Sequence, residues 1–327
     1  MSQQSDESIE LINFFKYISD DLSVIEGILK SKKIKFTQPS ALNDPLEFNP
    51  TIKYDNINTQ YDRYSLNGVL LPSADDHFRK KYILDQINLF GILSLTKIPD
   101  AFDMWNRYAN GHKGIVIVFR ENFENDKSML SSTGGQLPLK EVKYVEEYCL
   151  NLNDLKPNSN GQIPIEQIQE LYFYKKTKRW IDEREWRMVR SLWDRPDYDI
   201  NNPDKLYLFD ISIDCIDSII FGAKISVENK HKIKSYCENK IINYWQAVIV
   251  RNEMDRFGRI GKISLISNDQ INIFNLRPST CVLDKEQLQH IKIISINKLS
   301  DHPYYDIDRN FFDNYYMGVQ SRHRIPK

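Results

Sequence analysis

The stretch Lys178-Arg-Trp-Ile-Asp-Glu-Arg-Glu-Trp-Arg-Met-Val189 has the pattern of a polar helix end that runs into a β-strand. If residues 181–189 are extended, their side chains alternate between the two faces of a sheet. Glu183, Glu185 and Arg187 then share one face, between the apolar Ile181 and Val189 at its ends. The pattern therefore predicts two carboxylates and a guanidinium in a row on one side of a strand.

Two interpretations of this strand face remain open. Charged side chains resist burial unless they are paired, so a solvated sheet edge with a ladder of salt bridges is one of them. The other is the wall of a cleft, which the apolar residues at both ends and the neighbouring Trp180 and Trp186 favour.

Short strands and short helices follow one another along most of the chain, which predicts an α+β fold with a mixed, mainly antiparallel β-sheet flanked by helices. Strand patterns cover residues 14–17, 33–37, 91–96, 115–119, 142–145, 206–213, 218–222, 245–250 and 262–266. Helical patterns run through residues 24–29, 76–88, 99–108, 164–178 and 227–240, and a hairpin turn is expected at residues 257–262.

The expected domain organisation follows from where these patterns weaken. Residues 1–267 are predicted to form a single α+β catalytic-like domain, with a polar insertion at about residues 50–75. The segment 268–327 is less regular and rich in aromatic and acidic residues near its end. It is expected to be a C-terminal extension that docks on the domain.

Composition indicates a soluble cytoplasmic protein. The net charge is −1 and charged residues make up 27% of the chain, so no overall charge draws it to nucleic acid or anionic lipid. No run approaches the ~18 consecutive apolar residues of a membrane span, and the polar first residues do not resemble a signal peptide. Four scattered cysteines without a CxxC pair are typical of reduced structural thiols. We therefore expect no membrane association, and the sequence leaves the oligomeric state undefined.

A metal site is not expected, because the six histidines are scattered and none has the spacing of a ligand pair. A metal-dependent nuclease can still be assembled from Asp100 with Glu141 and Lys143, since such enzymes use an acidic residue followed by Glu-x-Lys. Asp100 also stands where a helix N-cap belongs, and capping is the better explanation for it.

Four polar blocks, each in an aromatic or apolar frame, resemble a bacterial family known as domain of unknown function 2971. Its members carry a short aromatic-basic strand and three further motifs. Here the strand is Phe15-Lys16-Tyr17, and the motifs are Phe36-Thr-Gln-Pro39 with Asn43-Asp-Pro-Leu-Glu47, Met104 to Gly114, and Trp180 to Arg187. The resemblance covers roughly residues 12–225, departs at Leu42 and Leu46 where the family favours Phe, and implies no reaction.

The layout is also similar, more distantly, to that of ADP-ribosyltransferases, which implies a split sheet of the ADP-ribosyltransferase kind. In that superfamily residues of the first and second strands hold NAD, and a glutamate on a late strand is catalytic. The resemblance implies Lys16 or Tyr17 for the first position, Thr37 for the second and Glu185 for the third. The superfamily uses His or Arg at the first position, so this chain departs from the pattern there.

The resemblance implies a chemistry for the charged strand. Cleavage of the nicotinamide–ribose bond passes through an oxocarbenium-like state, which Glu185 would stabilise through the ribose 2′-OH. Glu183 would orient or deprotonate the acceptor, and Arg187 would keep Glu185 ionised. The candidate NAD-binding residues are Lys16, Tyr17, Phe36, Thr37, Asn43, Asp44, Trp105, Tyr108, His112 and Lys113.

The sequence thus predicts an ADP-ribosyltransferase-like enzyme that uses NAD to modify an intracellular nucleic acid or protein, as a toxin or phage-defence effector. Two alternatives stay open. One is a nuclease or other nucleotide-processing enzyme that uses the same cleft. The other is a non-catalytic binding module, in which the Glu/Arg strand forms a structural polar network.

Overall fold

The chain divides into two compact units in a computed structural model. Unit 1 comprises residues 1–26, 97–121 and 214–327, and unit 2 comprises residues 27–96 and 122–213. The structure describes residues 13–44, 47, 51–53, 65–66, 69–70, 87–131, 137, 139–151, 154, 156, 158–159, 162–163, 165–192, 195, 197–199, 202, 205–237, 240, 242–254, 260–267, 282–287 and 289.

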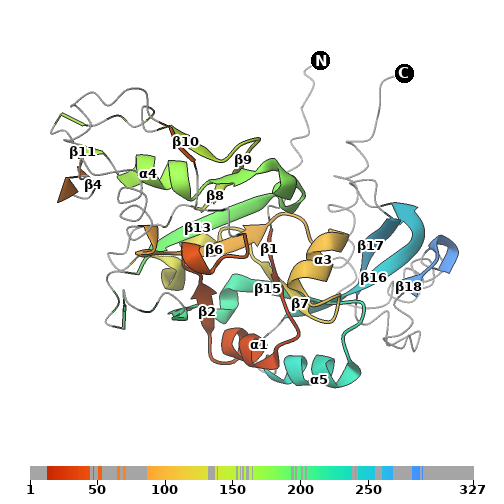
Figure 1. The fold of residues 1–327 in the computed structure, drawn as a ribbon. Coiled ribbons are helices and arrows are strands. Elements are labelled where there is room, and N and C mark those ends of the chain that lie inside the picture. Colours follow the sequence, from red (N-terminus) through yellow and green to blue (C-terminus); the bar gives the residue numbers. More distant parts are fainter. Residues whose placement is uncertain are drawn as a thin grey trace, which may run out of the picture. The chain divides into compact units, whose positions relative to one another are not determined.

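Unit 1 is built on a mixed sheet whose strands run in the order β17-β16-β15-β7-β1, with β18 parallel to β16 (Figure 1). Its strands are β1 Phe14–Ile18, β7 Ile115–Phe119, β15 Ile216–Phe221, β16 Asn243–Met254, β17 Ile260–Ser267 and β18 Val282–Leu283. All neighbouring pairs in this order are antiparallel except β15 and β16. Those two parallel strands are joined through helix α5, Val227–Ser235, as parallel neighbours require.

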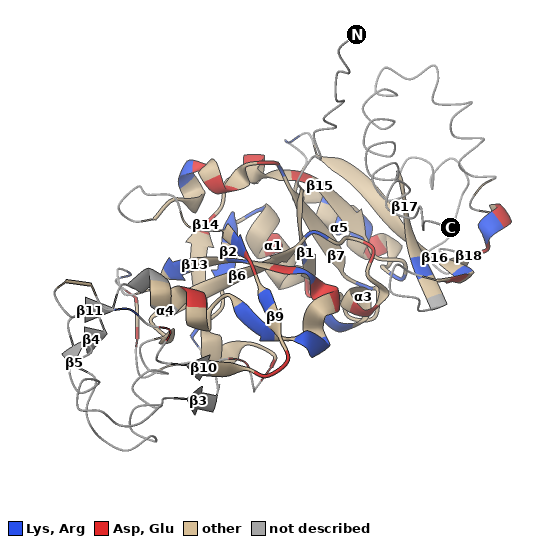
Figure 2. Cartoon of the chain, turned by 90° about the horizontal axis from the view of Figure 1, so that it is seen from above, with Lys and Arg blue, Asp and Glu red and all other residues tan. Residues whose placement is uncertain are grey.

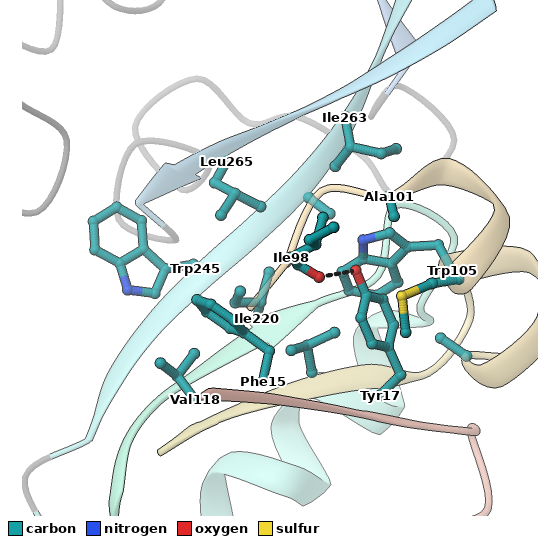
Figure 3. Close-up of a cluster of buried hydrophobic side chains, with 14 residues drawn as sticks. Phe15, Tyr17, Ile98, Ala101, Trp105, Val118, Ile220, Trp245, Ile263 and Leu265 are labelled. Carbon is teal, nitrogen blue, oxygen red and sulfur yellow. Dashed lines mark hydrogen bonds between the residues drawn. The ribbon is translucent and has the colours of Figure 1, made fainter. Parts of the chain in front are cut away.

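Helices cover both faces of this sheet. Helix α3, Phe102–Tyr108, buries Met104 and Trp105 against Phe15 and Tyr17 of β1 and further apolar side chains of the sheet (Figure 3). Tyr17 lies edge-on to Trp105 and donates its hydroxyl hydrogen bond to the Ile98 carbonyl at 2.9 Å. Residues 115–119 are all buried, as expected of a central strand with both faces covered.

Helix α5 lies on the opposite face, because it contacts side chains that alternate with the α3-facing ones. Lys230 and Lys234 sit over the rings of Phe221 and Tyr244. These two rings stack on each other with centroids 5.6 Å apart. Since Ile220 and Trp245, their strand neighbours, belong to the α3-facing core, the pleat directs the pairs to opposite sides.

Unit 2 contains the antiparallel strands β6-β13-β8, together with four further sheets of two or three short strands each. The antiparallel strands are β6 Phe90–Thr96, β13 Glu185–Ser191 and β8 Leu139–Glu141. Strand β2, Lys33–Phe36, pairs antiparallel with β14, Tyr207–Asp210, and β12, Lys175–Thr177, pairs parallel with β9, Lys143–Val145. The remaining strands are β3 Thr51–Lys53, β4 Ser65–Leu66, β5 Val69–Leu70, β10 Cys149–Asn151 and β11 Gln162–Ile163.

The described helices of unit 2 are short. Helix α4 spans Ile165–Tyr172, and 3-10 turns span Pro39–Ala41, Phe123–Asn125, Lys127–Met129 and Lys178–Glu183, the last being η6. Helix α1, Leu22–Leu29, crosses the boundary between the two units in sequence. Among the described residues, no helix combines the length and apolar character needed to cross a membrane.

The α+β class with a mixed, mostly antiparallel sheet is confirmed, and most expected strands lie within a few residues of their predicted places. Three local predictions are wrong. The helix predicted to reach Lys178 ends at Tyr172, and residues 175–177 form a strand. Residues 178–183 form η6, so Ile181 and Glu183 are not extended. The N-cap of α3 is Ala101 rather than Asp100, and no side chain caps it.

Some expectations fall outside the described residues. The helix predicted at residues 76–88 is described only at its last two positions, and the turn at 255–259 is not described. Short strands occur at both ends of the predicted insertion. Most of the predicted C-terminal extension, 268–327, also lies outside, so the proposed domain boundary stays a prediction.

Candidate functional site

The strand β13 brings Glu185 and Arg187 to one buried face of unit 2, as the alternation of its side chains predicts. Their residues are 5% and 0% exposed. Arg184 ends η6 in the left-handed conformation, with φ of 41°, and turns the chain into the strand. Glu183 therefore reaches the same region from η6 rather than from the strand face, and it is also buried.

Five charged side chains of unit 2 meet at this point. Arg187 donates from Nε to Glu185 Oε1 at 2.8 Å, and from Nη2 both to Glu185 Oε2 at 3.0 Å and to Glu47. Lys176 Nζ donates to Glu183 Oε2 and Glu185 Oε2, both at 2.9 Å, and lies 3.6 Å from Glu47 Oε2. We call these five residues (Glu47, Lys176, Glu183, Glu185 and Arg187) the buried ion cluster.

Backbone and hydroxyl groups complete the surroundings of the cluster. Arg187 donates a further hydrogen bond to the Phe173 carbonyl at 2.7 Å. The Glu185 N–H donates to the Tyr144 hydroxyl at 2.8 Å, and the Thr96 hydroxyl donates to the Glu183 carbonyl at 2.6 Å. These contacts fix the backbone that carries both glutamates, so their carboxylates are held in place before any ligand arrives. Residues of both charge signs lie along the ribbon beside β9 (Figure 2).

Lys176 and Glu47 are the members that sequence reasoning missed. Lys176 lies in β12 opposite Tyr144 of β9, and both strands have three residues. The sequence predicted a helix at this place, so the pairing was missed. Glu47 follows the Asn43-Asp-Pro motif and enters the cluster through a turn in which its N–H donates to the Asp44 carbonyl at 3.0 Å. The one sequence signal for Glu47 was its place in the family-like block. In that block, Asn43 and Asp44 were predicted to be the functional residues instead.

Two carboxyl groups of the cluster, Glu185 and Glu47, have pKa values that are shifted in opposite directions. Burial works to raise the pKa of Glu185, but the charges of Arg187 and Lys176 outweigh it and hold that pKa well below its usual range. Burial dominates for Glu47 and raises its pKa, against the lowering effect of Arg187. Burial likewise disfavours charged Lys176, yet the three surrounding glutamates raise its pKa above the usual value. Two carboxyl groups on one guanidinium thus differ in their affinity for a proton.

Asp44 and Trp180 lie beside the cluster. Asp44 is buried and accepts from Arg179 at 2.5 Å and from the Trp180 indole N–H at 2.7 Å. Lys176 Nζ lies 5.1 Å from the centroid of the Trp180 ring, within the range of a cation–π interaction. Asp44 was predicted to bind NAD; in the structure its two carboxylate oxygens hold η6.

The other candidate residues of unit 2 lie elsewhere in that unit. Phe36 is fully buried and packs edge-on to Phe209, with centroids 5.0 Å apart. Thr37 is half-buried and exchanges backbone hydrogen bonds with Ile92, and Asn43 is exposed. The structure shows a packing role for Phe36, and cofactor binding by these residues stays a prediction.

Six candidates belong to unit 1 and are described within it alone. Tyr17 and Trp105 are core residues of the α3-facing cluster, and Tyr108 packs against its edge. Lys16 is half-buried in β1, and Lys113 is exposed in the turn before β7. Because Lys16, Tyr17 and Glu185 lie in different units, their predicted convergence on NAD is not tested.

His112 is the sixth of these residues, and it is 1% exposed in a left-handed turn with φ of 71°. Its ring lies between Phe102 and Trp105, with centroids 4.7 Å and 6.2 Å away. Neither ring nitrogen has a hydrogen-bond partner among the residues that the structure describes. Burial, and secondly the charge of Lys224, lower the pKa of His112 from 6.5 to about 4.

This pKa predicts a pH dependence of stability. Below pH 6.5 the unfolded chain binds a proton that the folded His112 does not accept until about pH 4. The free energy of unfolding should therefore fall as the pH drops through this window, by up to about 3 kcal/mol. Urea unfolding of wild type and His112→Asn measures it, since Asn tolerates the left-handed backbone. The variant should lose this slope, and the exposed His231→Asn variant should keep it; equal slopes in all three would refute the assignment.

The three residues of the nuclease hypothesis belong to different units, so their convergence is not tested either. Asp100 belongs to unit 1, whereas Glu141 and Lys143 belong to unit 2, where both are exposed. Lys143 lies 3.9 Å from Glu170. In the described part of the chain, no group of three or more His, Cys, Asp or Glu side chains is arranged to hold a metal ion.

Comparison with known proteins gives one result on the chain's relatives. Residues 104–188 match the family model described as protein of unknown function, DUF2971. The family resemblance is thereby confirmed over this segment, which includes the block from Met104 to Gly114 and the block from Trp180 to Arg187. The searches of curated proteins and of solved structures found no match.

The segment matched by DUF2971 contains four members of the buried ion cluster: Lys176, Glu183, Glu185 and Arg187. The fifth, Glu47, lies outside the matched residues, in the Asn43-to-Glu47 block. The family description names no reaction, so the chemistry has to be argued from the cluster.

Proposed function

We propose that the chain is an ADP-ribosyltransferase-like enzyme that transfers ADP-ribose from NAD to an intracellular macromolecule, with the buried ion cluster as its catalytic centre. One observation carries the proposal: two carboxyl groups, Glu185 and Glu47, contact the same guanidinium, and their pKa values are displaced in opposite directions. Carboxyl pairs whose environments separate their pKa values are typical of sites that stabilise positive charge and move a proton.

Glu185 suits the stabilising role. It stays ionised, and a carboxylate has about four acceptor positions. Among the described residues Oε1 accepts one hydrogen bond, from Arg187, while Oε2 accepts from Lys176 and Arg187. A ribose 2′-OH would take the remaining position on Oε1. The negative charge beside the sugar would then stabilise the oxocarbenium-like state as the nicotinamide–ribose bond breaks.

Glu47 suits the proton transfer. The bonding pair of the nicotinamide–ribose bond leaves with nicotinamide, and a hydroxyl or amine of the acceptor forms the new bond to the sugar carbon. The acceptor must then lose a proton, and a carboxylate of raised pKa is the better base for it. This assigns to Glu47, whose pKa is raised, the task that the sequence suggested for Glu183.

The setting of the activity is part of the same proposal. We propose a cytoplasmic enzyme acting on a nucleic acid or protein, as a toxin or phage-defence effector. Scattered cysteines and a net charge of −1 support that compartment without selecting the acceptor.

A non-catalytic role is favoured by a different observation. Every member of the cluster has an oppositely charged neighbour within 4.0 Å, and all five are less than 9% exposed. A purely structural network would have these properties as well. It differs from the catalytic centre in one respect: its loss would change stability and leave the fate of NAD unaltered.

The test uses NAD labelled in the adenylate part, incubated with cell lysate and either wild type or Glu185→Gln. We expect wild type to transfer label to macromolecules, and the variant to transfer about a hundredfold to a thousandfold less, because a preorganised charge at the reacting centre is lost. Circular dichroism must show that the variant is folded under the assay conditions.

Glu141→Gln is the matched control, because Glu141 is an exposed carboxylate opposite Trp186 in the neighbouring strand. It should transfer label as wild type does. Equal transfer by wild type and folded Glu185→Gln would refute the proposed function.

A further inference from the structure

We propose that Asp44 is a positioning residue, which fastens to η6 the turn that the Glu47 N–H closes on the Asp44 carbonyl, and thereby holds the Glu47 carboxyl against Arg187 and Lys176. The inference deepens the proposed function and rests on it for its catalytic meaning. Asp44 was expected to contact NAD, whereas its carboxylate is occupied by the protein.

Asp44 accepts hydrogen bonds from two neighbouring residues of η6. Asp44 Oδ1 accepts from Arg179 at 2.5 Å, and Oδ2 accepts from the Trp180 indole at 2.7 Å. The Asp44 side chain is 3% exposed, while that of Arg179 is 50% exposed. Because a buried carboxylate is costly to leave without partners, these donors hold Asp44 in one place.

The link from Asp44 to the cluster is short on both sides. On one side the Glu47 N–H donates to the Asp44 carbonyl at 3.0 Å, so the two side chains are carried by a single turn. On the other side, the centroid of the Trp180 ring lies 5.2 Å from Arg179 Cζ and 5.1 Å from Lys176 Nζ. Trp180 therefore contacts both the residue that anchors the turn and the cation that Glu47 faces.

The consequence for Glu47 is a fixed electrostatic surrounding. It faces Arg187 and Glu185 from β13 and Lys176 from β12, while Glu183 of η6 shares that lysine. If the turn loosens, Glu47 gains water and loses part of the burial that raises its pKa. The proton affinity of Glu47 is thus set through Asp44. The position of Glu47 matters as well, because displacing a reacting group by about 1 Å lowers the rate about a hundredfold.

The test replaces the donors of Asp44 without changing any charge. Trp180→Phe removes the indole N–H and keeps an aromatic ring, and Arg179→Lys keeps the cation but loses the planar guanidinium contact. The Glu47 carboxyl is titrated by NMR in protein labelled with ¹³C-glutamate, its signal being assigned from Glu47→Gln. We expect the Glu47 pKa to fall in both variants, most in Trp180→Phe.

Activity gives the second readout. In label transfer from NAD, Trp180→Phe should lower kcat about a hundredfold with little change in KM, and the acid limb of its pH profile should move to lower pH. Tyr148→Phe is the control for a lost buried hydrogen bond in the same unit, since this hydroxyl donates to the Tyr172 carbonyl at 3.0 Å. It should titrate and react as wild type does.

Two results have distinct meanings. If Glu47 titrates identically in wild type and in both folded variants, the positioning role of Asp44 is overturned. If the titration moves as expected but wild type transfers no label, the proposed function fails while Asp44 still positions Glu47.

Discussion

Replacing Arg187 by Met should lower the free energy of unfolding by about 3–5 kcal/mol, or abolish folding at ambient temperature. Arg187 is fully buried and contacts two carboxylates, Glu185 and Glu47, besides the Phe173 carbonyl. Met has a similar volume, so packing is largely kept. The variant leaves buried negative charge in the cluster, with Lys176 as the one cation of the cluster. Removing one partner of a buried ion pair costs about this much free energy of unfolding.

Urea unfolding at pH 7 measures the effect, and two further variants give it meaning. Arg184→Met removes an exposed arginine three residues away and should change stability by less than about 0.5 kcal/mol. Combining Arg187→Met with Glu185→Gln removes a cation and an anion together, so the double variant should lose less than the sum of the single ones. Additive losses would mean that the two residues are not energetically coupled.

Substitution of Gly222 by Ala should destabilise the protein by about 4 kcal/mol or more, at the upper end of single-residue effects. A Cβ at this position would overlap the His112 carbonyl oxygen and lie 2.8 Å from the Gly114 carbonyl oxygen. Both obstacles are backbone atoms of unit 1, held by hydrogen bonds from the Lys224 and Gly222 N–H groups at 2.8 Å and 2.9 Å. They have no rotamer through which to move away, so the turn or the strand has to shift.

Gly27→Ala is the matched control for this prediction. Gly27 lies inside α1 with nothing within 4 Å of the place that an added methyl group would take, and alanine favours a helix over glycine by about 1 kcal/mol. Thermal unfolding should therefore show a small rise in Tm for Gly27→Ala and a large fall for Gly222→Ala. A Gly222→Ala protein as stable as wild type would contradict the close backbone approach between Gly222 and the turn at His112.

The fold class and the position of most strands could be predicted because their signal is local. Residues 115–119 are a continuous apolar run, and residues 33–36 alternate, so each pattern indicates its burial directly. The prediction for residues 173–183 failed because their structure depends on a contact that is distant in sequence. The charged and aromatic residues of this segment suit a helix, and only the pairing of Lys176 with Tyr144, more than thirty positions earlier, makes residues 175–177 a strand.

The candidate site was predictable in its strand but not in its full membership. Glu185 and Arg187 are two residues apart, so the strand period alone places them together. Glu47 is 140 positions from Arg187, and no local rule indicates such a contact. The resemblance to ADP-ribosyltransferases implied NAD binding by the aromatic residues Tyr17, Phe36 and Trp105. Their side chains are buried inside their units, and NAD binding by them stays a prediction.

The blocks that resemble the family thus combine two kinds of residue. Gly114 permits a close backbone approach and Trp105 fills a core, so folding explains these positions. The charged cluster differs from them, because apolar side chains of similar size would fill its space without the cost of desolvating five ions. A catalytic task would account for that cost, which supports our functional proposal.

Nicotinamide release from NAD, followed by chromatography with lysate present, tests the central claim most directly, because it reports bond cleavage whatever the acceptor is. Wild type and Glu141→Gln should release nicotinamide at the same rate. Folded Glu185→Gln should release it about a hundredfold to a thousandfold more slowly. If folded Glu185→Gln matches wild type, or wild type releases none above the lysate background, the buried ion cluster is not an NAD-cleaving centre.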